Sequence, residues 1–127
     1  MKRLVDTSIL IDHLRGQKEA LDLLVSFAQG GDELWSVTIV RTEVLAGMRP
    51  SEESMTHRLL DRFRWQDVTT EVADGAGALA REYAKAHSGI DTVDYVLASA
   101  ARLLGADLVT RNVKHFPMIA GLRAPYR

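Results

Sequence analysis

The chain contains no cysteine, and this absence removes several classes of chemistry. Without thiols there is no disulfide framework, no cysteine nucleophile and no cysteine-based zinc site. Long apolar runs are also missing, because Asp6 interrupts the N-terminal segment too early for a signal peptide and no run approaches the roughly 18 residues of a membrane span. We therefore expect a protein that is neither secreted nor inserted in a membrane. Its composition suits a reducing cytoplasm.

The net charge is close to zero, but the charges are unevenly distributed. The chain has 16 Lys and Arg against 17 Asp and Glu, for a net charge of -1. This balance argues against the uniformly basic surface of an architectural nucleic-acid-binding protein. Residues 95–127 nevertheless hold five basic residues and one acidic residue, while residues 1–94 are acidic overall. The basic stretch fits a phosphate-binding role and an ordinary solvated surface equally well.

Length and hydrophobic patterning indicate a single domain over residues 1–127. A chain of 127 residues with 46% hydrophobic and 26% charged residues can build one core and has no room for a second domain. Short apolar runs alternate with amphipathic segments, which favours a mainly parallel sheet inside a three-layer α/β/α sandwich. The expected strands are 3–6, 34–37, 66–68 and 106–110. The expected helices are a first one that contains Ile9, Leu10 and Leu14, a third one from near 38 or 42 to about 48, and helices over 17–29, 51–64, 70–87 and 92–104. Thr7 or Ser8 is the expected N-cap of the first helix.

Four polar side chains are expected to meet at the carboxyl edge of this sheet. Asp6 ends the first strand, Glu43 lies in the helix after the second strand, and Asp94 lies at the start of the helix before the last strand. Asn112 follows that last strand, two residues beyond Thr110. Because ligand sites of open parallel sheets form at the carboxyl ends of the strands, all four side chains can reach one edge.

Three carboxylates at one edge suit a hard divalent cation. Mg²⁺ takes oxygen ligands at about 2.0–2.1 Å, usually a few carboxylates and water. Without a cation, the carboxylates would repel one another and raise one another's pKa, so the cluster is costly as structure alone. Each acid also has a structural interpretation: Asp6 as a turn residue, Glu43 as a solvated helix acid, and Asp94 as the partner of an N-cap at Asp91. For Asp91 the cap is the better interpretation, and for Asp94 both remain open.

Four segments of the chain together resemble a known protein family. They are VDTSILID at 5–12, TEVLAG at 42–47, DYVLASAA at 94–101 and LVTRNVKHF at 108–116. In this order and at these separations they resemble the four successive motifs of PIN domains, and in particular the VapC-type toxins of bacterial toxin–antitoxin pairs. The resemblance extends from one end of the chain to the other.

The resemblance implies a metal-dependent endoribonuclease. It implies that Asp6, Glu43 and Asp94 bind Mg²⁺ or Mn²⁺ and that metal-activated water cleaves RNA. Asn112 stands where the family often has a fourth acid, and we include it in the catalytic set, although an amide adds no charge and leaves the number of metal ions open. Asp12 is interpreted as a helix-surface or supporting residue rather than a ligand. A VapB-type antitoxin and a second copy of the chain are the implied partners.

The remaining functional candidates are basic or hydroxyl-bearing side chains. Thr110 can contribute a hydroxyl to the substrate site, and Arg111 and Lys114 are candidates for contacting the RNA backbone. Arg58 and Arg62 are expected opposite the apolar face of helix 51–64, where they are either solvated or meet a partner. The four histidines show no metal-ligand spacing, and we interpret them as surface residues.

Three other classes of protein share an acidic α/β architecture. A receiver domain would have a pair of acids after its first strand and a phosphoacceptor aspartate after a middle strand, but Asp6 stands alone and Thr69 occupies the second place. A haloacid-dehalogenase-like phosphatase would have a second aspartate where Ser8 stands. A non-catalytic binding module could keep the same acids without taking up metal, so a metal titration distinguishes it from a nuclease.

Overall fold

The fold is built around a four-stranded parallel sheet. A computed structural model describes all 127 residues. The strands are ordered β3-β2-β1-β4, and every neighbouring pair is parallel. Their bounds are β1 Lys2–Val5, β2 Glu33–Val37, β3 Arg64–Gln66 and β4 Asp107–Val109. Because β1 is central and Val5 pairs with Val109, the segments that follow β1 and β4 begin side by side.

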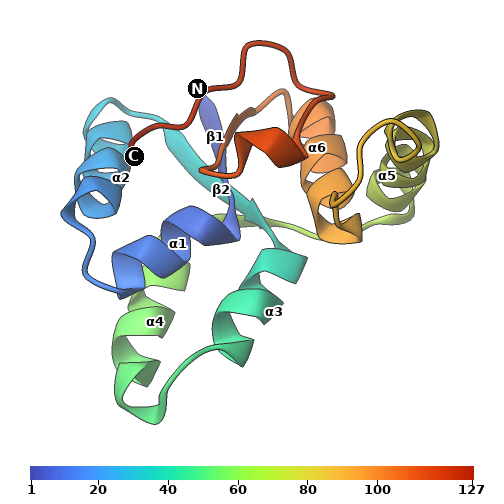
Figure 1. Cartoon of the computed structure of the whole chain (residues 1–127). Coiled ribbons are helices and arrows are strands. Elements are labelled where there is room, and N and C mark those ends of the chain that lie inside the picture. Colours follow the sequence, from blue (N-terminus) through green and yellow to red (C-terminus); the bar gives the residue numbers. More distant parts are fainter.

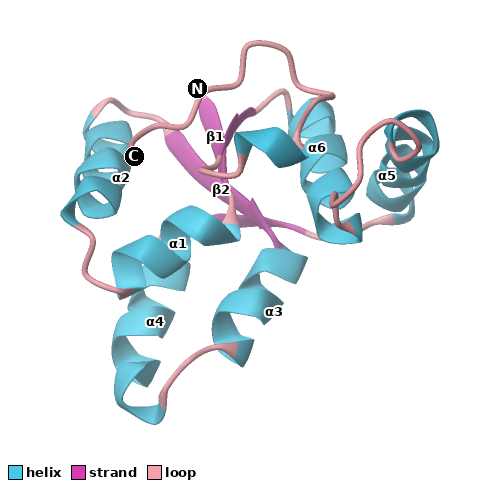
Figure 2. Ribbon diagram, in the orientation of Figure 1, coloured by secondary structure: helices cyan, strands magenta, loops and turns pink.

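Six α-helices surround the sheet and give the expected three-layer sandwich. Helices α1 and α2 lie on one side of the sheet, and α5 and α6 lie on the other (Figure 1). Helices α3 and α4 extend beyond the carboxyl ends of the strands (Figure 2). The bounds are α1 Thr7–Leu14, α2 Lys18–Gln29, α3 Thr38–Ala46, α4 Glu53–Leu60, α5 Thr70–Tyr83 and α6 Thr92–Leu104. None of these helices combines the length and the apolar character that crossing a membrane requires.

Helix α6 is the centre of one half of the core. Every residue from Asp94 to Ala101 is buried, because α6 packs against both the sheet and α5. The contact with α5 is close at Gly75, where an added Cβ would collide with the Ser99 hydroxyl. That hydroxyl donates a hydrogen bond to the Val72 carbonyl oxygen at 2.8 Å. The approach of the two helices therefore depends on a residue without a side chain.

The segment between residues 50 and 66 differs from the sequence-based prediction. Instead of one helix over 51–64, the chain forms a 3₁₀ turn at Pro50–Glu52 and then α4, which ends at Leu60. The strand expected at 66–68 begins earlier, at Arg64. The cause is tertiary, because Trp65 pairs with Ser36 of β2 and its indole N–H donates to the Leu60 carbonyl oxygen at 3.1 Å. Helix α5 also ends four residues earlier than the expected 87.

Candidate active site

Asp6 is held at the junction of β1 and α1. Its backbone N–H donates to the Val109 carbonyl oxygen at 2.9 Å and so continues the pairing of β1 with β4. Its Oδ1 accepts from the Thr7 backbone N–H at 2.6 Å and caps α1. The prediction that Thr7 or Ser8 caps this helix is therefore wrong, because both have already entered the helix while Asp6 keeps the extended backbone of a cap. Its Oδ2 accepts from the Thr110 hydroxyl at 2.6 Å and the Ser8 hydroxyl at 3.4 Å.

Asp94 lies in the first turn of α6 and is 8% exposed. Its Oδ2 accepts from the Asp91 backbone N–H at 3.0 Å, and the two residues form a capping box. The prediction of Asp91 as the N-cap is thus confirmed. The same oxygen lies 3.1 Å from Nδ1 of His115. Its Oδ1 accepts no hydrogen bond from the chain, so Asp94 performs its structural role and still keeps one free oxygen.

Glu43 reaches the site from α3 through a hydroxyl bridge. Its Oε1 accepts from the Thr7 hydroxyl at 2.7 Å. Because Thr7 also donates its backbone N–H to Asp6, one residue connects the carboxylates of Asp6 and Glu43. The Glu43 side chain is exposed, in contrast to those of Asp6 and Asp94.

The carboxylates destabilise one another's charged forms. Burial raises the pKa of Asp6, hydrogen bonds from Thr110 and Thr7 oppose this, and the charges of Asp94 and Glu43 raise it further. Burial also raises the pKa of Asp94, and the charge of Glu43 adds to that rise. Repulsion from Glu43 thus reaches both buried acids. The three side chains predicted from sequence share one electrostatic environment at the carboxyl edge of the sheet.

The donor set fits a hard divalent cation, although the acids do not yet surround a common point. No three acidic or histidine side chains of the structure lie at mutual distances that would hold a metal ion. Other groups take the oxygens that a cation would use: Thr7 bonds Glu43, Thr110 bonds Asp6, and His115 contacts Asp94. All the candidate ligands are carboxylate oxygens, which Mg²⁺ and Mn²⁺ prefer. A cation would also offset the repulsion that raises the pKa of the buried acids.

The loop after β4 completes this edge of the site. Thr110 is fully buried, and its hydroxyl donates to Asp6 and accepts from the Asn112 backbone N–H at 3.0 Å. The hydroxyl proposed from sequence for the substrate is therefore used within the chain. The Asn112 side chain is exposed and makes no hydrogen bond with the protein. Its amide is therefore free to bind a ligand.

Of the two basic candidates in this loop, Arg111 forms an ion pair within the chain and Lys114 does not. Arg111 Nη1 donates to Asp12 Oδ2 at 2.8 Å, and this bond raises the pKa of Arg111. Lys114 is exposed and forms no ion pair. Asp12 is buried, at 9% exposure, and is therefore not a residue of the helix surface. Lys114 is thus free to bind another molecule, whereas Arg111 is bound to Asp12.

Sequence reasoning missed the contributions of Thr7 and His115. His115 lies at the surface as expected, with 41% of its side chain exposed, but its ring also contacts Asp94 from the turn at Val113–His115. No spacing in the sequence relates the two, because they approach only when α6 and the segment after β4 have packed. For Thr7 a signal was present, since a hydroxyl directly follows Asp6 in the first motif.

Comparison with known proteins identifies the family. The model of the PIN domain matches residues 3–122, which include all four motifs. The chain belongs to the PIN domain family. This PIN domain is 44% identical to Ribonuclease VapC19 of Mycobacterium tuberculosis over 98% of the chain and 99% of that protein. It is 40% identical to Ribonuclease VapC10 of the same species over 97% of the chain and 92% of that protein.

A solved structure supports the same assignment. The PIN domain superposes on a chain of a toxin–antitoxin complex from Klebsiella pneumoniae with a TM-score of 0.81 and 28% sequence identity, covering 98% of both chains. The parallel sheet and its helical layers thus match those of a chain from a toxin–antitoxin complex. The resemblance inferred from the four sequence segments is confirmed at the level of family and fold.

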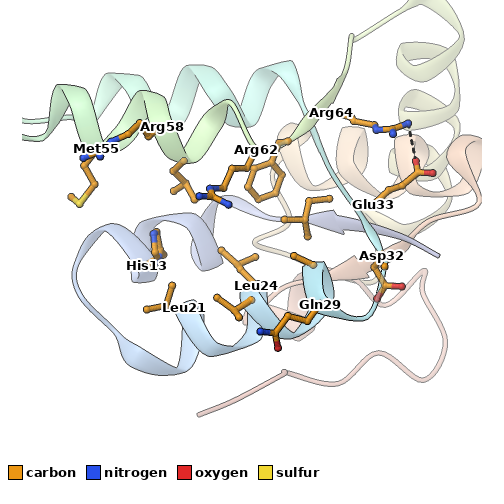
Figure 3. Close-up of a pocket in the computed structure, with 16 residues that line it drawn as sticks. His13, Leu21, Leu24, Gln29, Asp32, Glu33, Met55, Arg58, Arg62 and Arg64 are labelled. Atoms are coloured by element: carbon orange, nitrogen blue, oxygen red, sulfur yellow. Dashed lines mark ion pairs between the residues drawn. The ribbon is translucent and has the colours of Figure 1, made fainter.

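One groove of this PIN domain lies apart from Asp6, Glu43 and Asp94. It has a volume of about 820 Å³ and lies between α1, α2, β2 and α4 (Figure 3). Leu21 and Met55 form part of its wall and are partly exposed, at 46% and 40%. Arg58 and Arg62 are exposed, away from the buried Leu59 and Leu60 as expected, and both line the same groove. Met55, expected on the apolar face, is exposed beside them.

Proposed function

We propose that this protein is a metal-dependent endoribonuclease and the toxin of a toxin–antitoxin pair. The observation that carries the proposal is the set of three carboxylates, Asp6, Glu43 and Asp94, at the carboxyl edge of a parallel sheet, two of them buried and with raised pKa. RNA as the substrate is supported by two relatives named as ribonucleases at 44% and 40% identity over nearly the whole chain. Residues 1–127 act as one nuclease domain, in the cytoplasm where RNA is present.

Asp6, Glu43 and Asp94 are the proposed ligands of Mg²⁺ or Mn²⁺. When bound, the cation lowers the pKa of a water molecule and offsets negative charge that develops at phosphorus. Thr110 holds Oδ2 of Asp6, and Thr7 holds Glu43 beside it. Asn112 offers an uncharged amide to a phosphate oxygen, and Lys114 offers a free ammonium group to the RNA backbone. No side chain of the set is a nucleophile.

The cleavage test compares two aspartates of different position. Asp6→Asn removes a charge from the proposed site, whereas Asp74→Asn removes one from an exposed position on α5. We expect the wild-type protein and Asp74→Asn to cleave RNA in Mn²⁺ and to show no cleavage in EDTA. Asp6→Asn should show no cleavage in either buffer. Cleavage by Asp6→Asn at the wild-type rate, or wild-type cleavage that is unchanged by EDTA, would contradict the proposal.

A VapB-type antitoxin is the proposed partner, and the structure suggests two places for it. Its C-terminal segment is expected to place an Arg or Lys among the three carboxylates, where a basic group satisfies the charge that a metal otherwise satisfies. The similar Klebsiella pneumoniae chain comes from a toxin–antitoxin complex, which supports a partner of this kind. Full nuclease activity of the complex at stoichiometric antitoxin would count against this arrangement.

The groove of Figure 3 suits an acidic amphipathic segment of the same antitoxin. Arg58 and Arg62 form no ion pair within the chain. Burial lowers the pKa of His13, and the positive charge of Arg62 lowers it further. Opposite them, Leu21 and Val25 of α2 are 46% and 42% exposed. Replacing Arg58 and Arg62 together with glutamate should weaken antitoxin binding in calorimetry. Arg81→Glu on the remote helix α5 is the control and should leave the affinity unchanged.

A further inference from the structure

The C-terminal end of the chain closes on helix α1 through one buried carboxylate. Oδ2 of Asp12 accepts from Arg111 Nη1 at 2.8 Å and from the Tyr126 hydroxyl at 2.7 Å. The Arg111 guanidinium carbon lies 5.7 Å from the centre of the Tyr126 ring. These three side chains come from α1, from the loop after β4 and from the chain end, and we call them the Asp12–Arg111–Tyr126 cluster. Asp12 and Tyr126 are 114 positions apart in the sequence.

The cluster is connected to the carboxylate site through the backbone of the loop 110–112. The Arg111 N–H donates to the Ser8 hydroxyl at 3.3 Å, and that hydroxyl in turn lies 3.4 Å from Oδ2 of Asp6. On either side of Arg111, Thr110 donates to the same oxygen of Asp6 and Asn112 donates its N–H to Thr110. The loop thus touches Asp6 with the Thr110 hydroxyl, while the Arg111 side chain anchors it to α1.

The Arg111 side chain is poorly placed to contact an RNA phosphate. To reach a phosphate, Nη1 would have to leave Asp12, and that carboxylate, only 13% exposed, would lose the positive charge that compensates it. The Tyr126 hydroxyl remains a neutral donor to Asp12, because burial and this bond raise the pKa of Tyr126, and a neutral donor does not supply the positive charge that Arg111 would take away. The contact with Asp12 thus favours Arg111 as an anchor of the loop over the phosphate contact expected from its position in the sequence.

We propose that Asp12 and Tyr126 are positioning residues of the nuclease site, which hold Arg111 and thereby keep the Thr110 hydroxyl on Asp6. This inference rests on the proposed function, because it assigns these residues a role in the same site. Neither residue touches the substrate. Each acts through Arg111 on the loop that orients Asp6, and small displacements of a reacting group lower the rate of a catalysed step steeply.

The first test is Tyr126→Phe, which keeps the ring and the net charge and removes one hydrogen bond. We expect kcat for RNA cleavage to fall roughly three- to tenfold, since a hydrogen bond to a charged group is lost, while KM stays within about twofold. Tyr83→Phe removes a hydroxyl on the remote helix α5 and should change neither constant. A KM effect without a kcat effect would overturn the proposal.

Two further measurements separate an anchor from a phosphate contact. In an Arg111→Ala background, Tyr126→Phe should have almost no additional effect on kcat, because it acts through Arg111. The salt dependence of RNA binding should keep its slope in Arg111→Ala, whereas a lost phosphate contact lowers that slope by about one. Additive effects of the two substitutions, or a reduced slope, would overturn the proposal.

The last measurement needs neither RNA nor metal. Amide hydrogen exchange at Arg111 and Asn112 should be faster in Tyr126→Phe than in the wild type, and unchanged in Tyr83→Phe, because these two amides are bonded to Ser8 and Thr110 within the anchored loop. Unchanged exchange at both amides would refute the positioning role. If the wild-type protein cleaves no RNA, the proposed function fails while the exchange data still decide whether Tyr126 holds the loop.

Discussion

The substitution Asp6→Asn tests whether Asp6 binds a cation or only makes local hydrogen bonds, because the two roles predict effects of opposite sign on the stability of the protein. Asparagine keeps the size of the side chain, and its carbonyl oxygen can still accept from the Thr7 backbone N–H that Asp6 caps. What disappears is one negative charge in a buried position, at 5% exposure, beside two other acids. The two interpretations of Asp6 therefore predict different results for one protein variant.

In metal-free buffer near neutral pH we expect the variant to be as stable as the wild type or more stable. Burial and the charges of Asp94 and Glu43 raise the pKa of Asp6, which means that folding disfavours its ionised form. Removing the charge removes that penalty and offsets a weakened contact with Thr110. If Asp6 served only local hydrogen bonds, the same change would cost roughly 0.5–2 kcal/mol.

Adding metal should make the wild type the more stable of the two proteins. Binding to the folded state alone stabilises it by RT ln(1 + [L]/Kd), about 2.7 kcal/mol at a hundredfold excess over Kd. For a domain of this size such a gain raises the melting temperature by roughly 10 °C. The variant should gain much less, because it has lost one of three charged ligands.

The assay is thermal unfolding followed by circular dichroism, first in EDTA and then in a Mn²⁺ series. Asp74→Asn on the surface of α5 serves as the control and should follow the wild type in both buffers. A loss of stability that is equal with and without Mn²⁺, together with retained RNA cleavage, would refute the reasoning that assigns Asp6 to a metal site.

Three other measurements test separate parts of the structure. Because the folded-state pKa of Asp6 and Asp94 is raised, their contribution to metal-free stability is present below the ordinary value of 3.8 and is lost as pH rises through the raised pKa. Thermal melting across this range should show the decline, and Asp6→Asn should reduce it. Gly75→Ala should destabilise the protein by about 1–3 kcal/mol in urea unfolding, since the new Cβ meets the α6 serine hydroxyl, whereas Gly77→Ala, with open space around it, should be neutral or stabilising. Lys114→Ala should lower the salt slope of RNA binding by about one without changing Mn²⁺ affinity, and an unchanged slope would leave this lysine as ordinary surface.

Local sequence patterns determined the type of fold and the set of candidate acids. Hydrophobic periodicity is a property of neighbouring residues, so it located the strands and helices to within a few residues and predicted a parallel sheet between helical layers. In such a sheet the carboxyl ends of strands share one edge, and this places Asp6, Glu43 and Asp94 together before any coordinates are known. The prediction failed where a segment depended on its partner, as at β3, which is a strand because it pairs with β2.

Only the tertiary structure decided how each acid is held. Asp6 accepts the Thr110 hydroxyl across 104 positions of sequence, and Asp12 binds Arg111 across 99 positions and Tyr126 across 114. The contact of His115 with Asp94 likewise forms only when the turn after β4 packs beside α6. No periodicity encodes such contacts, because they join segments whose distance is set by the packing of the whole sheet and its helices. The sequence therefore determines which carboxylates can bind a cation, and the packing determines which hydroxyl, amide and imidazole groups orient them.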